Sequence, residues 1–164
     1  MTAGGRAANI PLFLSSTVEQ VLASGVSAGL GLVDDAGLVA VYLPKEPTLV
    51  LKLASSETPL SKNDPKLKLV KQVMAGVNVA AAAEAMSLGV KVGLDTEKLY
   101  EIISTAAGTS AMFVDRTPQL LSGKWTSKKT VNDVVSELVY FYYAFTQFLA
   151  NDKNRSNRSM RQPR

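Results

Sequence analysis

One stretch, residues 64–93, decides the fold: DPKLKLVKQVMAGVNVAAAAEAMSLGVKVG. Asp64 is a good helix N-cap, and Pro65 suits the first helical position, where its missing N–H costs nothing. No further proline interrupts the stretch, and Gly93 supplies a stop. It therefore predicts a helix of about 28 residues, roughly 42 Å long at 1.5 Å per residue. The small side chains in its Ala-rich middle would let another helix approach closely.

The sequence after this stretch predicts three more helices. One should begin after Asp95 and end at Gly108, and the segment 109–126 should hold a short helix and a turn. A last helix is expected over 127–150, amphipathic up to Leu138 and aromatic all round beyond it. Its inward positions are expected to be Val131, Val134, Val135 and Leu138. The fold class that follows is all-α, a helical bundle with one long Ala-rich helix.

The N-terminal part of the chain predicts another helix and a short apolar segment. Ser16 with Glu19 three residues later has the pattern of a capping box, and apolar residues follow at helical spacing. Gly29 and Gly31 should end that helix. Asp34 or Asp35 then offers a cap for the apolar segment that follows.

The chain divides into four parts by composition. Residues 5–43 form a helical segment, and 44–64 read as a Pro-rich and polar linker in which 48–53 could be a single short strand. Residues 65–150 form the helical domain. Residues 151–164 have the composition of a disordered basic tail.

The charge distribution narrows the class of partner. The chain has 18 Lys and Arg against 14 Asp and Glu, and the tail alone holds five of these basic residues and one acid. The remainder has 13 of each and is neutral, so it shows no electrostatic footprint for nucleic acid. The absence of His and Cys excludes His or Cys zinc sites, Ser-His or Cys-His nucleophile pairs and disulfides. We expect no metal site, and Lys, Asp, Glu and Tyr remain for acid–base work.

The apolar runs in the sequence indicate the cellular compartment, because signal peptides and membrane-spanning helices both contain continuous apolar runs. The start of the chain lacks a charged lead followed by a continuous apolar run, so no signal peptide is expected. The most apolar run, 138–150, has thirteen residues, whereas a membrane-spanning helix needs about 20. We therefore expect a soluble, cytoplasmic protein without a membrane partner.

Three polar residues near the start of the long helix share one face. Lys68, Lys71 and Gln72 are three and four residues apart. If this face looks into a cleft, burial and the like charges would both lower a lysine pKa, which makes lysine a usable acid or base. The alternative is a solvated basic helix face, which is common at helix starts. The chain shows no glycine-rich phosphate-binding loop of its own.

A longer string places these residues in a family context. The sequence KLKLVKQVMAGVNVAAAAEAMSLGVKVGLDTEKLYEIISTAAGTSAMF, followed by DRTPQLLSGKW, resembles the β-hydroxyacid dehydrogenase family, the 3-hydroxyisobutyrate dehydrogenase-like enzymes related to 6-phosphogluconate dehydrogenase. The resemblance is to their all-helical C-terminal domain and covers roughly residues 66–138. It implies a separate Rossmann domain that binds NAD or NADP, and a helical domain that closes over the nicotinamide and supplies a catalytic lysine.

The resemblance assigns roles to individual positions. The family motif Lys-x-x-Asn-Asn/Gln falls on Lys68, Lys71 and Gln72, which makes Lys68 and Gln72 the implied catalytic residues and Lys71 a departure. The later motif Lys-Asp-Leu falls on Ser136, Glu137 and Leu138. Ser136 and Glu137 are therefore the implied cofactor contacts, although the lysine of that motif is missing.

The N-terminal segment resembles the C-terminal end of the helical domain in the same family. Residues 5–43 look like the last helices of such a domain, so a domain end precedes a domain beginning. This order suggests a fragment of a tandem protein that lacks the Rossmann domain. We expect residues 5–43 to pack on 64–138 and rebuild one helical domain in permuted order, because neither part alone offers a large core.

Two functions follow from different classes. The first is the helical domain of an NAD(P)-dependent 3-hydroxyacid oxidoreductase, inactive alone, with a small hydroxyacid substrate and a Rossmann domain in another chain or a homo-oligomer as partner. The second is a non-catalytic dimerisation or interaction module derived from such an enzyme. A nucleic-acid binder acting through the tail has only the local charge in its favour, and we expect no nucleic-acid partner.

Overall fold

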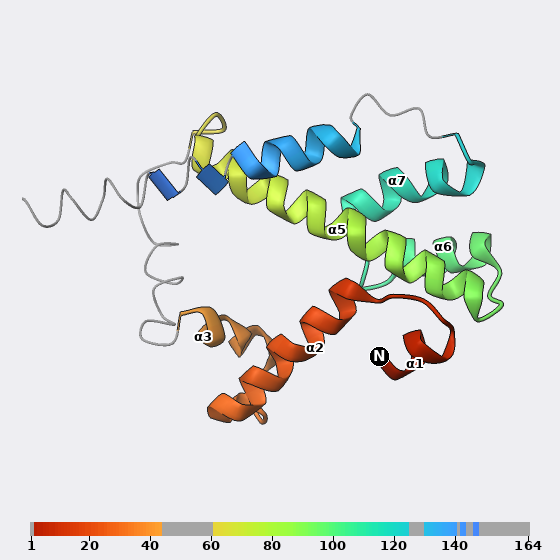
Figure 1. Ribbon diagram of the computed structural model, residues 1–164, viewed down its shortest axis with the longest axis horizontal. Coiled ribbons are helices and arrows are strands. Elements are labelled where there is room, and N and C mark those ends of the chain that lie inside the picture. The colour runs from red at the N-terminus through yellow and green to blue at the C-terminus, as the bar shows by residue number, and fades with distance from the viewer. Residues whose placement is uncertain (1, 44–60, 125–129, 141, 144–145, 148–164) are drawn as a thin grey trace, which may run out of the picture.

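The computed structural model describes residues 2–43, 61–124, 130–140, 142–143 and 146–147 (Figure 1). These residues form helices and no strand, which confirms the all-α class. The elements, in chain order, are α1 (Thr2–Ala7), α2 (Phe13–Gly25), a π-helical turn η1 (Val26–Leu30), a 3-10 turn η2 (Asp35–Leu38), α3 (Val39–Tyr42), α5 (Pro65–Lys91), α6 (Thr96–Thr105) and α7 (Ala111–Ser122). Residues 131–140 form a further helix. The expected strand at 48–53 and the tail lie outside the described residues.

Helix α5 begins and ends where the sequence predicts. The Asp64 side chain accepts a hydrogen bond from the backbone N–H of Lys66 at 2.8 Å, which caps the first turn. The helix runs for 27 residues to Lys91, and Gly93 then turns the chain at a φ of 81°, a conformation that favours glycine.

Helices α6 and α7 also use the caps that their sequences offer. The Asp95 side chain accepts from the backbone N–H of Lys98 at 2.9 Å. Ser110 accepts in the same way from Phe113 at 3.1 Å, and Gly123 ends α7 at a φ of 65°. The expected helix after Asp95 and the short helix within 109–126 are therefore confirmed.

The core lies where α6 and α7 pack on the C-terminal half of α5 (Figure 1). Its buried residues are Ala82, Met86 and Phe113, and the half-buried residues around them are Leu99, Tyr100, Ile103 and Leu121. The Tyr100 and Phe113 rings stack with centroids 5.8 Å apart. Gly89 permits the close α5–α6 crossing, because a Cβ there would force the Leu99 side chain to move.

The helix of residues 131–140 lies along the N-terminal half of α5 (Figure 1). Gly76 permits the close approach, since a Cβ there would lie 3.6 Å from Leu138 and 3.9 Å from Val134. The expected inward orientation is correct for these two residues. Val131 and Val135 are 80% and 51% exposed, so neither is buried in this packing.

The N-terminal segment forms an arm that we define as residues 13–42. Its helix α2 meets α5 at the first turn and then projects away from it, with α3 folded back on α2 (Figure 1). Gly25 allows that fold, because a Cβ there would lie 3.2 Å from Leu38 and 3.6 Å from Val41. The expected packing on 64–138 is therefore present at one end of α2, and most of the arm remains apart.

The capping box expected at Ser16 is wrong. Helix α2 already begins at Phe13, and the Ser16 hydroxyl donates back to the carbonyl oxygen of Leu12 at 2.6 Å. The other two expectations for this segment are confirmed. Gly29 breaks the helical path at a φ of 86°, and the Asp34 side chain caps the next turn by accepting from Ala36 N–H at 2.9 Å.

Helix α5 is long and apolar enough to cross a membrane by length and composition, with a mean hydropathy of 1.5 over its best window. The bent pair Phe13–Leu30 and Asp35–Tyr42 passes the same test. Helix α5 thus passes a length requirement that the thirteen-residue run at 138–150 does not meet. The core helix of a soluble protein passes this test too, so the cytoplasmic location stays a prediction.

Candidate functional site

Two of the residues singled out from the sequence meet across helices. The Gln72 amide nitrogen on α5 donates to the Glu137 carboxylate on the 131–140 helix at 2.5 Å. Because a carboxylate only accepts, this bond fixes the orientation of the amide and turns its oxygen Oε1 away from Glu137. That oxygen is buried and has no hydrogen-bond partner. A buried acceptor without a donor costs about 1–3 kcal/mol, so the arrangement leaves one interaction unfilled.

A cavity of about 520 Å³ lies beside this pair, between α5, α7 and the helix of residues 131–140. Small and apolar side chains dominate its lining. The lining residues are Gln72, Ala75, Gly76, Val79, Ala80, Ala83, Met112, Arg116, Thr130, Val131, Val134, Glu137 and Leu138. The cavity is therefore an apolar space with polar groups from three helices at its margin, which is the usual make-up of a small-molecule site.

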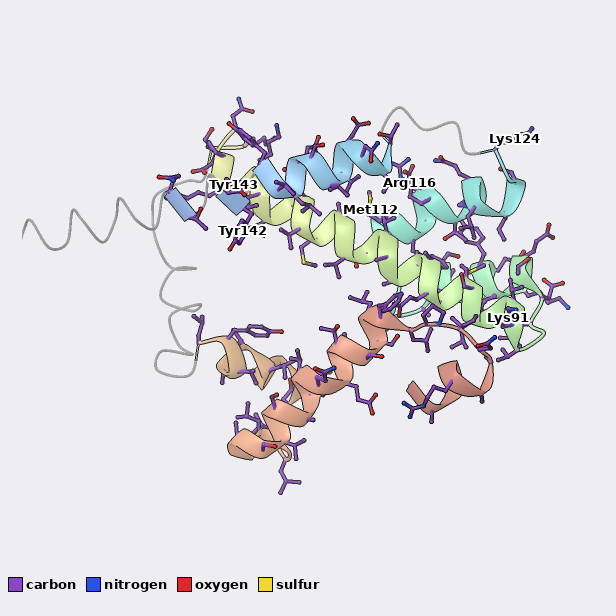
Figure 2. The ribbon with its side chains drawn as sticks, viewed as in Figure 1. Lys91, Met112, Arg116, Lys124, Tyr142 and Tyr143 are labelled. Carbon is purple, nitrogen blue, oxygen red and sulfur yellow. The ribbon has the colours of Figure 1, made fainter. Side chains whose placement is uncertain are left out.

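Helix α7 contributes residues that the sequence did not single out. Met112 and Arg116 are four residues apart, share one face of the helix and lie where α7 approaches the 131–140 helix (Figure 2). The Arg116 Nε lies 3.4 Å from the Asp115 carboxylate, and both side chains are well exposed, so this pair holds the guanidinium weakly. The sequence signal that could have pointed to Arg116 is that it is the single arginine in the segment DRTPQLLSGKW, which is part of the family resemblance.

The lysines lie at the edge of this site. Lys68 is exposed, one helical turn before Gln72, and does not line the cavity. Lys71 is exposed as well. The cleft that the sequence argument required around Lys68 is therefore not formed by the residues that the structure describes. Its role as the catalytic residue stays a prediction.

The two implied cofactor contacts face different surroundings. Ser136 is exposed, whereas the half-buried Glu137 is engaged with Gln72. A carboxylate at this position suits hydrogen-bond donors and repels phosphates. The structure thus brings Gln72 and Glu137 together, leaves Lys68 a turn away, and points Ser136 to solvent. The roles of Ser136 and Glu137 toward a cofactor also stay predictions.

Glu84 forms a second polar centre, on the opposite side of α5. Its carboxylate accepts from the backbone N–H groups of Leu14 at 2.5 Å and Ser15 at 3.1 Å, and from the Ser15 hydroxyl at 2.9 Å. The N-cap residue of α2, Leu12, has no side chain that could do this. An acid from another helix therefore caps the positive end of α2.

These contacts change the ionisation of Glu84. Burial alone would raise the pKa of its carboxyl group, but the hydrogen bonds from Leu14 and Ser15 outweigh burial and hold the pKa below the ordinary value of about 4.5. The charged form is thus the one that fixes the arm to α5.

We expect the contact between arm and α5 to weaken in acid. Because the pKa of Glu84 is lowered on folding, its stabilisation is present above the ordinary glutamate pKa and is lost as the pH falls through the folded value. Glu84→Gln should remove most of this pH dependence, and Glu101→Gln, on exposed α6 surface, should leave it intact. Amide hydrogen exchange of Leu14 and Ser15 between pH 3 and 7 measures it. Equal pH profiles for the wild type and Glu84→Gln would contradict the assignment.

The described residues form neither a metal site nor a dinucleotide-binding unit. The part of the chain that the structure describes contains no group of three or more His, Cys, Asp or Glu residues that could hold a metal ion. A dinucleotide fold needs a strand followed by a glycine turn and a helix. The described segments contain no strand, so they do not form such a unit.

Comparison with known proteins gives the site a context. Residues 65–138 match the family described as NAD-binding of NADP-dependent 3-hydroxyisobutyrate dehydrogenase. L-Threonate dehydrogenase of Cupriavidus necator is 45% identical over 73 residues, which are 44% of this chain and 25% of that protein. The L-threonate dehydrogenases of Haemophilus influenzae and Escherichia coli K12 are 39% and 36% identical over 72 residues, 44% of this chain and 24% of each protein.

These matches cover only part of this chain and only part of each relative. The chain spans about a quarter of the length of the curated relatives that it matches. No solved structure gives a significant match. Less than half of the chain is covered, and the arm lies outside it. Residues 65–138 thus match the helical domain of the 3-hydroxyisobutyrate dehydrogenase family, which confirms for this part of the chain the resemblance seen in the sequence.

Proposed function

We propose that residues 65–138 form the helical half of an NAD(P)-dependent hydroxyacid dehydrogenase site, which a dinucleotide-binding domain outside this chain completes. The observation that carries the proposal is the convergence of Gln72 and Glu137 beside the cavity, with Lys68 one turn away. Helix α5 and the 131–140 helix hold these residues on rigid elements. The relatives that act on L-threonate suggest a small hydroxyacid as the substrate class.

Lys68 would serve as the acid–base residue at the substrate hydroxyl. Lys68 is exposed in the structure, as expected for a residue that would face a separate domain. Closure by that domain would bury the Lys68 amine beside the substrate hydroxyl, where it can take the hydroxyl proton. Burial on closure is therefore part of the proposed mechanism.

Gln72 would orient the substrate. Glu137 holds its amide nitrogen, so the orphaned oxygen Oε1 is the group that remains to accept a hydrogen bond from a substrate hydroxyl. That oxygen is buried, so a donor reaches it only after neighbouring side chains move. Arg116, at the cavity margin, carries the charge that a substrate carboxylate needs.

The residues present fit only one end of the cofactor. The mostly apolar lining of the cavity suits the nicotinamide ring, whereas nothing in the described segments cradles the phosphates. When bound, the cofactor would supply hydride acceptance. The binding of its phosphates is assigned to the separate dinucleotide-binding domain, so residues 65–138 alone are expected to be inactive.

A second function has its own support. Lys71 stands where the family has an amide, and Ser136 stands where it has a lysine. Exposed apolar side chains along α5 and the arm would also suit a module that binds another protein surface. On this account the chain is a non-catalytic dimerisation or interaction module derived from the enzyme.

A domain graft separates the two functions. In the graft, residues 65–138 replace the matching segment of the Cupriavidus necator L-threonate dehydrogenase. The rest of that enzyme is left unchanged. We expect NAD(P)-dependent oxidation of L-threonate, measured by NAD(P)H absorbance, within about 100-fold of the parent enzyme, because the other half of the site is intact. A graft that folds, by circular dichroism and melting, and shows no turnover would favour the interaction module.

A further inference from the structure

Helix α5 carries an exposed apolar stripe, which we define as Val70, Val73, Met74 and Val77. These side chains are between 43% and 59% exposed. Helical geometry turns 100° per residue, so the stripe lies on the same face as Glu84 and roughly opposite Gln72. The stripe is thus separate from the cavity, and it continues directly from the contact between Glu84 and the arm.

The arm itself offers matching apolar surface. Val18 and Leu22 on α2 are 43% and 44% exposed, and Tyr42 on α3 is 65% exposed. Residues 13–42 contain only three charged residues, Glu19, Asp34 and Asp35. Figure 1 shows the arm and the N-terminal half of α5 diverging from their meeting point, with α3 on the inner side of the opening. Two weakly charged surfaces therefore face the same open space.

The spacing along the two helices agrees. Ser15 donates to Glu84 and marks the point where α2 and α5 meet. Leu22 lies seven residues after Ser15, and Val77 lies seven residues before Glu84, so each is about 10 Å from the meeting point. Helices that run antiparallel from this point would place the two side chains level with each other.

We propose that the stripe on α5 is the docking surface for the arm of the same chain. The arm reaches it by swinging about the hydrogen bonds between Glu84 and the first turn of α2. Closure buries Leu22 against Val77 and removes apolar surface of α5 from water, which is favourable. The contact at Glu84 persists through the motion, because its donors belong to the first turn.

Closure of the arm would leave the candidate site open. The cavity, Gln72 and Lys68 lie on other faces of α5, so the docked arm does not cover the candidate site. Docking would rebuild a compact helical domain from the two ends of the chain. It does not rest on the proposed dehydrogenase function and can be tested without any ligand.

Engineered cysteines test the docking, because the chain contains no cysteine of its own. In the full chain, Leu22→Cys with Val77→Cys should oxidise to a disulfide within one molecule, seen as a compact monomer on non-reducing electrophoresis. Leu22→Cys with Val90→Cys is the matched control, since Val90 is exposed on another face beyond the meeting point. The first pair should react at least about ten-fold faster than the control.

Each other outcome overturns the proposal. Disulfides between chains would assign the stripe to a second copy, and equal rates for both pairs would show that the arm does not dock. Circular dichroism of the reduced variants shows whether they fold. As an independent measurement, Val73→Lys added to the first pair should slow the intramolecular disulfide about ten-fold, because closure would then bury a charge. An unchanged rate would contradict docking on the stripe.

Discussion

Lys68→Ala in the L-threonate dehydrogenase graft is expected to lower kcat by about 100-fold to 10,000-fold, the usual contribution of a positioned acid–base group. The reason is that α5 offers Lys68 as the basic residue one turn from Gln72, and the chain has no histidine that could replace it. The KM for L-threonate should change far less, since Lys68 acts on the hydroxyl proton rather than on the carboxylate. Steady-state kinetics of NAD(P)H formation measure both constants.

Lys71→Ala is the matched control for this loss. It removes the same charge from the same exposed stretch of α5, three residues away. We expect kcat of this variant to stay within about three-fold of the unmodified graft, as for a surface substitution. Equal losses in the two variants would mean that a general positive charge, and not Lys68, supports turnover.

Met86→Ala should give the largest loss of stability. Met86 is 1% exposed and lies at the centre of the core, beside Ala82 and Phe113. Removal of a buried methionine side chain leaves a cavity and costs about 2–5 kcal/mol in the free energy of unfolding. Urea denaturation followed by circular dichroism measures this value.

Val90→Ala provides the comparison on the same helix. Val90 is 57% exposed, so its truncation should change the free energy of unfolding by no more than about 0.5 kcal/mol. A loss below about 1 kcal/mol for Met86→Ala would show that the packing of α6 and α7 on α5 is not the main core of the chain.

Local signals made α5, α6 and α7 predictable from sequence. Asp64, Asp95 and Ser110 each cap the helix that follows, and Gly93 and Gly123 end helices in conformations that favour glycine. Such signals act within four residues of the chain, so they can be read without the tertiary structure.

Contacts between distant residues were not predictable in the same way. The start of α2 depends on Glu84, about 70 positions along the chain, and Ser16 looked like a cap because nothing near it revealed this partner. In the site, spacing on one helix placed Lys68 and Gln72 together, but the bond from Gln72 to Glu137 depends on how two helices pack. The cavity and Arg116 follow from the same packing and left almost no sequence signal.

The most direct test of the central claim, that Lys68 moves the substrate proton, is chemical rescue of the Lys68→Ala graft. Methylamine added at increasing concentration can occupy the space left by the lysine and carry the proton in its place. The claim predicts that kcat rises with methylamine concentration in Lys68→Ala, while the unmodified graft and Lys71→Ala do not respond. A Lys68→Ala graft that folds, binds NAD(P) and L-threonate, and gains no activity from methylamine would contradict it.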